Sequence, residues 1–275
     1  MFDNFTTWNA YEAPGDGANQ IGWPFALYVT HTGSIYMADG KNDRVIRVNG
    51  ISGSGWTSFG TYGSGVGMGQ FDKLLGLWVD ESSGNKIYLA DGTRIKRMDD
   101  MSGAGWTVYG DSGSGDGQFT RAWGITVRTH ATTGFPAGIY VSDRKLDRIV
   151  YISDMTGAGW TTFGTNGTGV GQFKGPSGIA FGKDDKLYIV DTHRIVRIDD
   201  MTGAGWTTYG YPGPGTTAGQ FYLPEGIALD SLNRIYVADS AHMVRMDDMT
   251  GAGWLTFGGM FDGKLLGTIV GVAVH

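Results

Sequence analysis

Residues 226–257 read GIALDSLNRIYVADSAHMVRMDDMTGAGWLTF, and this stretch decides the fold. It holds four short runs, at 226–230, 234–239, 243–246 and 254–257, which are rich in β-branched and aromatic residues and are separated by turn residues. Such runs are typical of β-strands, and no segment of the chain combines helical periodicity with matching caps. The stretch therefore predicts four short antiparallel strands.

The same pattern recurs along nearly all of the 275 residues. Three markers repeat in phase, at intervals of 46 to 54 residues between the tryptophans. A Gly-Trp-Thr-x-aromatic-Gly pattern lies around Trp56, Trp106, Trp160, Trp206 and Trp254, with a degenerate copy around Trp8. Tyrosines followed three residues later by aspartate are Tyr36, Tyr88, Tyr140, Tyr188 and Tyr236, with Asp39, Asp91, Asp143, Asp191 and Asp239. Gly-Gln-Phe ends at Phe71, Phe119, Phe173 and Phe221, and Gly-Met-Phe ends at Phe261.

Four short strands in each unit of 40 to 50 residues predict an all-β fold, the β-propeller, as one domain over residues 1–275. Each blade of such a ring buries its faces against the blades before and after it. The 48 glycines fit this fold, because turns need positive φ and the crowded channel needs close backbone approach. We expect that close approach where the innermost strands begin, at Gly76, Gly124, Gly178 and Gly226.

Counting the strands predicts a six-bladed propeller with five complete blades and an incomplete sixth. Innermost strands are expected at 26–29, 76–79, 124–127, 178–181, 226–229 and 271–274, and outermost strands at the six tryptophan positions, but only five second and five third strands are found. The N-terminal strand around Trp8 would then close the ring beside Val272. Three explanations stay open: the natural chain continues past His275, another chain donates the missing strands, or five blades close alone.

The repeat resembles the NHL family in two motifs. Gly219-Gln220-Phe221 followed by Pro224 and Gly226-Ile227-Ala228 is one, and Ile35-Tyr36 with Asp39 and Arg44-Val45 is the other. The resemblance implies a propeller, most often six-bladed and closed by its amino-terminal strand, that serves as an interaction platform for protein, RNA or carbohydrate. Related propellers include lyases that open a cyclic peptide antibiotic or cleave peptidyl-hydroxyglycine, so the fold does not fix the function.

The repeated polar residues are expected to be structural, because one active site needs only one copy. The aspartate that ends each second strand can accept hydrogen bonds from turn amides and meet the residue that opens the third strand: Arg44, Arg94, Arg148, Arg194 or His242. The Asp-Asp turns at Asp99-Asp100, Asp199-Asp200 and Asp247-Asp248, with Ser153-Asp154 as a partial match, offer too few carboxylates for a convincing Ca²⁺ loop. The five histidines, His31, His130, His193, His242 and His275, show no constellation for zinc or iron. We therefore expect no cofactor and no catalytic residue.

The candidate binding surface is the face where fourth-to-first and second-to-third strand connections gather, because the blades differ there. Aromatic and charged residues suit a protein or carbohydrate partner. The candidate partner-binding residues are Tyr62, Asp111, Asp116, Arg144, Lys145, His193, Tyr211 and His242. A ten-residue insertion at 128–137 lies on the opposite face and is either a partner-binding loop or a tolerated insertion.

Composition narrows the partners further. A net charge of −6 argues against nucleic acid and anionic membranes, and the longest apolar stretch is too short to cross a bilayer. The first residues, Met-Phe-Asp-Asn-Phe, do not form a signal peptide, although an extracytoplasmic origin stays open. The absence of cysteine removes thiolate chemistry. The expected function is a non-enzymatic propeller scaffold, with a metal-dependent lyase and a self-assembling protein joined through the incomplete blade as alternatives.

Overall fold

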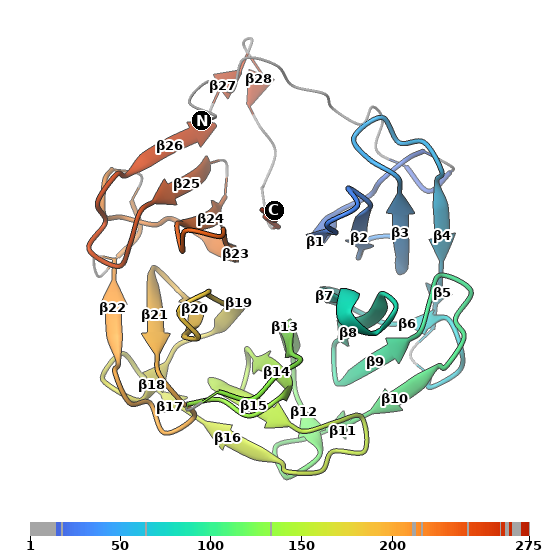
Figure 1. Cartoon of the computed structure of the whole chain (residues 1–275), viewed down its shortest axis with the longest axis horizontal. Coiled ribbons are helices and arrows are strands. Elements are labelled where there is room, and N and C mark those ends of the chain that lie inside the picture. The colour runs from blue at the N-terminus through green and yellow to red at the C-terminus, as the bar shows by residue number, and fades with distance from the viewer. Residues whose placement is uncertain are drawn as a thin grey trace.

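Five four-stranded antiparallel sheets are arranged as blades around a central channel (Figure 1). This computed structural model describes residues 15–274 except 18, 64, 133, 211–212, 216, 241, 259, 262–263 and 266–270. In every blade the chain runs outward from the channel through four consecutive strands. The prediction of an all-β propeller with four-stranded blades is confirmed.

The strands fall into four rings of increasing radius. The innermost strands are β1 (Pro24–Val29), β7 (Leu74–Asp80), β13 (Ala122–Arg128), β19 (Pro176–Phe181) and β23 (Pro224–Leu229). The second strands are β2 (Ile35–Asp39), β8 (Lys86–Asp91), β14 (Gly138–Asp143), β20 (Leu187–Asp191) and β24 (Ile235–Asp239). The third strands are β3 (Arg44–Val48), β9 (Arg94–Met98), β15 (Arg148–Ile152), β21 (Arg194–Ile198) and β25 (His242–Met246). The outermost are β4 (Thr57–Phe59), β10 (Thr107–Tyr109), β16 (Thr161–Phe163), β22 (Thr207–Tyr209) and β26 (Leu255–Gly258).

Short elements complete the chain between the blades. Three parallel pairs lie in connections from an outermost strand to the next innermost one: β5 (Thr61–Tyr62) with β6 (Gln70–Phe71), β11 (Asp111–Ser112) with β12 (Gln118–Phe119), and β17 (Thr165–Asn166) with β18 (Gln172–Phe173). An antiparallel pair, β27 (Met260–Phe261) with β28 (Lys264–Leu265), follows the last blade. One 3₁₀ turn, η1 (Glu81–Ser83), follows β7. The sequence pattern did not predict these small pairs.

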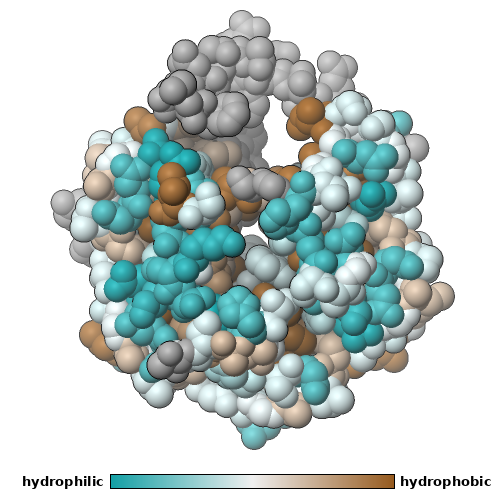
Figure 2. All heavy atoms as spheres, viewed as in Figure 1, coloured by the Kyte–Doolittle hydropathy of each residue, from teal (hydrophilic) through white to brown (hydrophobic). Residues whose placement is uncertain are grey.

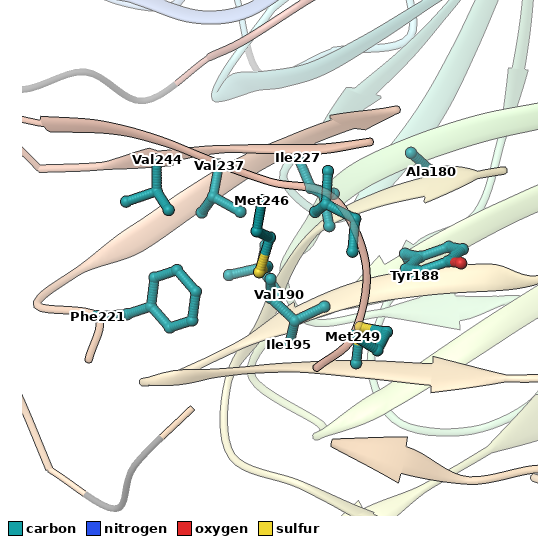
Figure 3. Packing of buried hydrophobic residues seen from close by; sticks show 11 residues of the cluster. Ala180, Tyr188, Val190, Ile195, Phe221, Ile227, Val237, Val244, Met246 and Met249 are labelled. Atoms are coloured by element: carbon teal, nitrogen blue, oxygen red, sulfur yellow. The ribbon is translucent and has the colours of Figure 1, made fainter. Parts of the chain in front are cut away.

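The core lies between the blades, because each sheet is apolar on both faces. Figure 3 shows one such layer, in which Tyr188 and Ile195 of the fourth blade meet Ile227 and Val244 of the fifth. The phenylalanine of each Gly-Gln-Phe marker is fully buried and packs on the next tryptophan, as in Phe221 on Trp254 with ring centroids 5.4 Å apart. The two sequence markers therefore recur in phase because they touch.

Five blades are described rather than six, so the six-blade detail of the prediction is not confirmed. The expected strand at 271–274 is not a strand, since within the described part of the chain it pairs with no neighbour. These residues nevertheless line the channel together with the five innermost strands, and a Cβ on Gly271 would lie 3.3 Å from the Cα of Ala26. The expected strand around Trp8 lies outside the described residues.

The insertion at 128–137 packs onto the fourth blade. Its Phe135 is fully buried, and the ring lies 5.0 Å from that of Phe181 and 5.7 Å from that of Tyr140. The Tyr140 hydroxyl donates to the Pro136 carbonyl at 2.7 Å. This burial fixes the insertion as part of the interface between the third and fourth blades. Over the described ranges, the structure holds no helix that is both long and apolar enough to span a membrane.

Candidate partner-binding site

The loop face is held rigid by the glycine-rich turns that precede each innermost strand. In three of these turns the glutamine of Gly-Gln-Phe folds back, and its side-chain oxygen accepts from a backbone amide three residues earlier: Gln70 from Gly67, Gln118 from Gly115 and Gln172 from Gly169, at 2.9 to 3.2 Å. The following phenylalanine anchors the turn in the core. A face built this way presents its side chains with little freedom to rearrange.

The aspartates that end the second strands stabilise the same face, because their carboxylates accept hydrogen bonds from amides of the connections that lead to the innermost strands. The Asp143 carboxylate accepts from the amides of Thr120 and Arg121, and Asp239 accepts from those of Tyr222 and Leu223, at 2.7 to 3.3 Å. Burial raises the pKa of both carboxyls, against the effect of these amides. The expected structural role of these aspartates is confirmed.

The expected partner on the third strand is confirmed in three blades and wrong in one. Arginine meets the carboxylate in the pairs Asp39–Arg44, Asp143–Arg148 and Asp191–Arg194. In the second blade Arg94 turns to Asp111 instead, at 3.2 Å, and the buried Lys96 pairs with Asp91. Lys96 occupies a position that is isoleucine or valine in the other blades, so its ammonium reaches the carboxylate from inside the core.

A tryptophan lies at the mouth of the channel on this loop face. Each innermost strand has a register irregularity in the two or three residues around its channel position, as between Ala122 and Ile125 of β13. Such a bulge re-aims the residue that it contains, and the residue ahead of the channel position is Phe25, Leu75, Trp123, Ser177 or Glu225. Phe25 lies edge-on to Trp123, with ring centroids 6.0 Å apart and planes at 82°. Blades one and three thus contribute aromatic rings to one mouth.

Two guanidinium groups surround the Trp123 ring. Arg144, from the turn between β14 and β15, has its Cζ 4.2 Å from the ring centroid, and Arg121 lies at 4.8 Å. Arg144 also donates to the Glu225 carboxylate of the fifth blade. This ion pair joins the third and fifth blades across the channel mouth. We name this cluster of Phe25, Arg121, Trp123, Arg144 and Glu225 the Trp123 mouth.

The charges of the Trp123 mouth are unequal, since two arginines share one carboxylate. Arg144 is half-buried and paired with Glu225, whereas Arg121 is exposed, and within the described residues no carboxylate lies at ion-pair distance from it. Partial desolvation and the neighbouring Arg144 charge lower the pKa of Arg121. A guanidinium remains charged even so, which leaves one positive charge beside an aromatic face.

The channel itself is narrow and apolar. Its volume is about 190 Å³, below the roughly 300 Å³ at which small-molecule pockets begin. Glycines, aliphatic residues and four aromatic residues (Tyr28, Trp78, Trp123 and Phe181) line it, and of the described lining residues none carries a carboxylate, imidazole, ammonium or guanidinium group. The channel is therefore smaller than a typical small-molecule pocket.

The structure brings Arg144 of the predicted set into the Trp123 mouth and scatters several others around the rim. Tyr62 in β5 is 74% exposed, Asp111 in β11 pairs with Arg94, and Asp116 and Lys145 are exposed. Tyr211 lies outside the described residues. Whether these residues bind a partner stays a prediction.

The two predicted histidines approach one buried carboxylate. His242 lies opposite Asp239 in the strand pair β24–β25, and the charges of His242 and His193 both act to lower the pKa of Asp239, although burial raises it overall. His193 also lines a cavity of about 430 Å³ with Lys174, Arg194 and Thr208. This arrangement joins neighbouring blades.

Four residues of the Trp123 mouth were not predicted from the sequence: Phe25, Arg121, Trp123 and Glu225. Phe25, Trp123 and Glu225 each lie one residue before an aligned channel position, and the residue type at this position differs from blade to blade. No repeated pattern marks Arg121, because it lies in a connection whose length and composition vary between blades. Only its position next to the start of the innermost strand could have pointed to it.

Metal ligation finds no support in the described ranges, where no three His, Asp or Glu side chains gather in a way that could hold an ion. The aspartates of the Asp-Asp turns accept hydrogen bonds from residues of their own turns instead. Asp100 accepts from the Ser102 hydroxyl and amide, and Asp200 does the same from Thr202, at 2.5 to 2.8 Å. These hydrogen bonds lower the pKa of both aspartates.

Blades of four antiparallel strands around a central channel define the chain as a β-propeller. The NHL repeat profile matches residues 221–243, and this match together with the blade arrangement supports an NHL-repeat β-propeller. No curated protein matches the chain in sequence.

Solved structures with the same arrangement belong to diverse proteins. A chain of a nidogen/laminin complex is 16% identical, with 91% of this chain and 84% of that chain covered and a TM-score of 0.68. A gluconolactonase from Xanthomonas campestris is 14% identical, with 92% and 80% covered and a TM-score of 0.64. Virginiamycin B lyase from Staphylococcus aureus is 16% identical, with 87% and 71% covered and a TM-score of 0.56. Such low identities establish a shared fold only.

Proposed function

We propose that this propeller is a non-enzymatic scaffold that binds a protein partner across the Trp123 mouth. The observation that carries the proposal is the exposed Arg121 guanidinium beside Trp123, next to a second arginine that is already paired. Tryptophan and arginine are the residues that most often dominate the energy of protein interfaces. The partner would supply an aspartate, a glutamate or a terminal carboxylate to Arg121 and an apolar group to the exposed part of the ring.

The chemistry of the mouth favours this partner despite the net charge of −6. The Debye length is about 8 Å at physiological ionic strength, so distant acidic residues repel an approaching carboxylate only weakly. A bidentate arginine–carboxylate contact adds direction as well as attraction. The rim residues Tyr62, Asp111 and Lys145 would extend the contact around the same face.

The sixth position of the ring belongs to the same proposal. Residues 271–274 line the channel as a sixth segment, and the first blade buries Met37, Ile46 and Val48 on the face that points away from the second blade. We infer that the ring has six blade positions, and that residues 271–274 belong to the sixth position, which closes the ring. No comparable observation supports a metal-dependent lyase or a self-assembling protein.

Selection from a displayed random-peptide library tests the binding function directly. Wild-type protein should enrich peptides with an acidic residue next to an aromatic or aliphatic one, and Trp123→Leu should enrich none of them. Enriched peptides without acidic residues, or equal capture by Trp123→Leu, would overturn the proposal. A uronic-acid oligosaccharide that binds where the peptides fail would replace the protein partner with a carbohydrate.

A further inference from the structure

The opposite end of the channel opens into a second hollow, which no part of the proposed function uses. Its volume is about 560 Å³, and it lies where the turns between first and second strands converge. Figure 1 is viewed from this side, with η1 in front of β7 and β8, and Figure 2 shows hydrophilic residues gathered around a central hollow. The volume falls within the range of small-molecule pockets, about 300 to 1,000 Å³. We name this hollow the lower bowl.

Two aromatic rings from adjacent blades form one wall of the lower bowl. Tyr28 of β1 and Trp78 of β7 have ring centroids 5.0 Å apart and planes at 74°. Both are half-buried, and both line the bowl. In this near-perpendicular contact the edge of one ring packs on a face of the other, and a ring face that stays open to the bowl attracts a cation.

The charge of the lower bowl is negative. Four carboxylates and two permanently charged cations line it: Asp80, Glu81, Asp185 and Asp230 against Arg128 and Lys183. Its two histidines, His31 and His130, are exposed and face carboxylates, with His31 Nδ1 3.0 Å from Glu81 and His130 Nε2 4.0 Å from Asp185. Asp185 is paired with Arg128 and Asp230 with Arg234, so the remaining carboxylates, Asp80 and Glu81, outnumber the remaining fixed positive charge, Lys183, by one.

The far wall already contains an internal version of the interaction. The Arg128 guanidinium is almost fully buried, lies 4.7 Å from the centroid of the Phe181 ring, and pairs with Asp185. Within the described chain no lysine or arginine lies over Tyr28 or Trp78 in the same way. The aromatic pair thus has the ring faces and the nearby acid, Glu81, but no cation.

The carboxylates of this wall already hold their hydrogen bonds. Glu81 accepts from the Tyr28 hydroxyl at 3.2 Å and from the His31 amide at 2.9 Å, and Asp80 accepts from Ser82 and Ser83. A ligand whose charge is carried by N–H donors would have to compete for these oxygens. A cation without donors would gain the electrostatic attraction and lose no hydrogen bond.

We propose that the Tyr28–Trp78 wall of the lower bowl binds a quaternary ammonium group. Methyl groups would lie against the two rings, while Glu81 and Asp80 stabilise the charge without direct hydrogen bonds. The inference goes beyond partner binding at the Trp123 mouth, which lies at the other end of the channel.

Titration calorimetry with choline tests the proposal, with 3,3-dimethylbutan-1-ol as the neutral isostere. At about pH 8, choline should bind at least about tenfold more tightly than the alcohol. Trp78→Leu should weaken choline binding by about tenfold and Glu81→Gln by a smaller factor, while Trp23→Leu, at an exposed tryptophan that does not line the bowl, leaves it unchanged.

Equal heats for choline and the alcohol, or unchanged binding by Trp78→Leu, would overturn the inference. Thermal melts check that each variant is folded, and Tyr28→Leu replaces Trp78→Leu where the latter does not fold. Because choline is titrated without any peptide, the result is independent of the proposed function.

Discussion

Single glycines set the radius of the channel. A Cβ at Gly76 would lie 2.3 Å from the Trp123 carbonyl oxygen, and one at Gly124 would lie 2.4 Å from that of Ser177. Gly178 would meet the Glu225 carbonyl at 2.6 Å. The predicted close approach at these three positions is confirmed, because each innermost strand packs on the backbone of the next.

Gly124→Ala should therefore destabilise the ring although its backbone φ is ordinary. The closest atom to the methyl group is the main-chain Ser177 carbonyl oxygen at 2.4 Å, followed by the Ile179 amide nitrogen and the Ser142 hydroxyl at 3.1 Å, so we expect a loss of about 2 kcal/mol in the free energy of unfolding by urea. Ala26→Gly, at the equivalent position of the first blade, is the control and should cost less than about 1 kcal/mol. Wild-type stability for Gly124→Ala would contradict this account of the channel.

A buried carboxyl makes the stability depend on pH. Asp43 is 8% exposed, and burial together with the Asp91, Asp72 and Asp39 charges raises its pKa to about 6. A raised pKa means that the folded protein holds the proton more tightly, so this group's contribution to stability falls as pH rises from about 4 through about 6.

Asp43→Asn should remove that loss. We expect the variant to be about 1 kcal/mol more stable than wild type at about pH 7.5, with the difference vanishing near pH 4. Asparagine also tolerates the positive φ of 48° at this position. Urea unfolding at both pH values measures the effect, and a constant difference across the range would refute the assigned pKa.

At the scale of the element, the second blade shows how one repeat departs from the others. Lys96 donates to Asp91 and to the Gln70 carbonyl, and its ammonium lies 5.2 Å from the Phe71 ring centroid. The Asp–Arg pairing was predictable where the repeat is regular. It failed at Arg94 because a core lysine two residues later takes the carboxylate.

Lys96→Val should be costly even though Val150, Val196 and Val244 occupy the same position elsewhere. Removing one partner of a buried ion pair costs about 3 kcal/mol or more, because the other charge stays buried. Adding Asp91→Asn should restore part of the stability. If Lys96→Val alone matches wild type in chemical denaturation, Arg94 has replaced it and the pair is dispensable.

For the whole molecule, the closing segment of the ring gives a direct prediction. Val272 is 8% exposed and lines the channel with the innermost strands. Val272→Asp should lower the unfolding free energy by about 2 kcal/mol, because it buries an unpaired charge. An appendage outside the ring would tolerate the change, so an unaltered melting curve would count against a sixth position.

The sequence predicted the blades well and the site poorly, for one physical reason. Blades repeat, so a contact such as Phe221 on Trp254 leaves the same trace four times over in the described chain. The Trp123 mouth joins residues of the first, third and fifth blades once only. Arg144 was found because it lies in a variable turn, whereas its partner Glu225 lies 81 residues away and shows no pattern that links the two.

The central claim is that Arg121 binds a carboxylate of the partner, and a double-mutant cycle measures it. An acidic peptide from the library and its glutamate-to-glutamine version are titrated into wild type and Arg121→Gln. We predict a coupling energy of about 1 to 2 kcal/mol between Arg121 and the acidic residue, with neither substitution adding to the other's loss. Independent, additive losses would contradict the claim and place the partner's acid elsewhere.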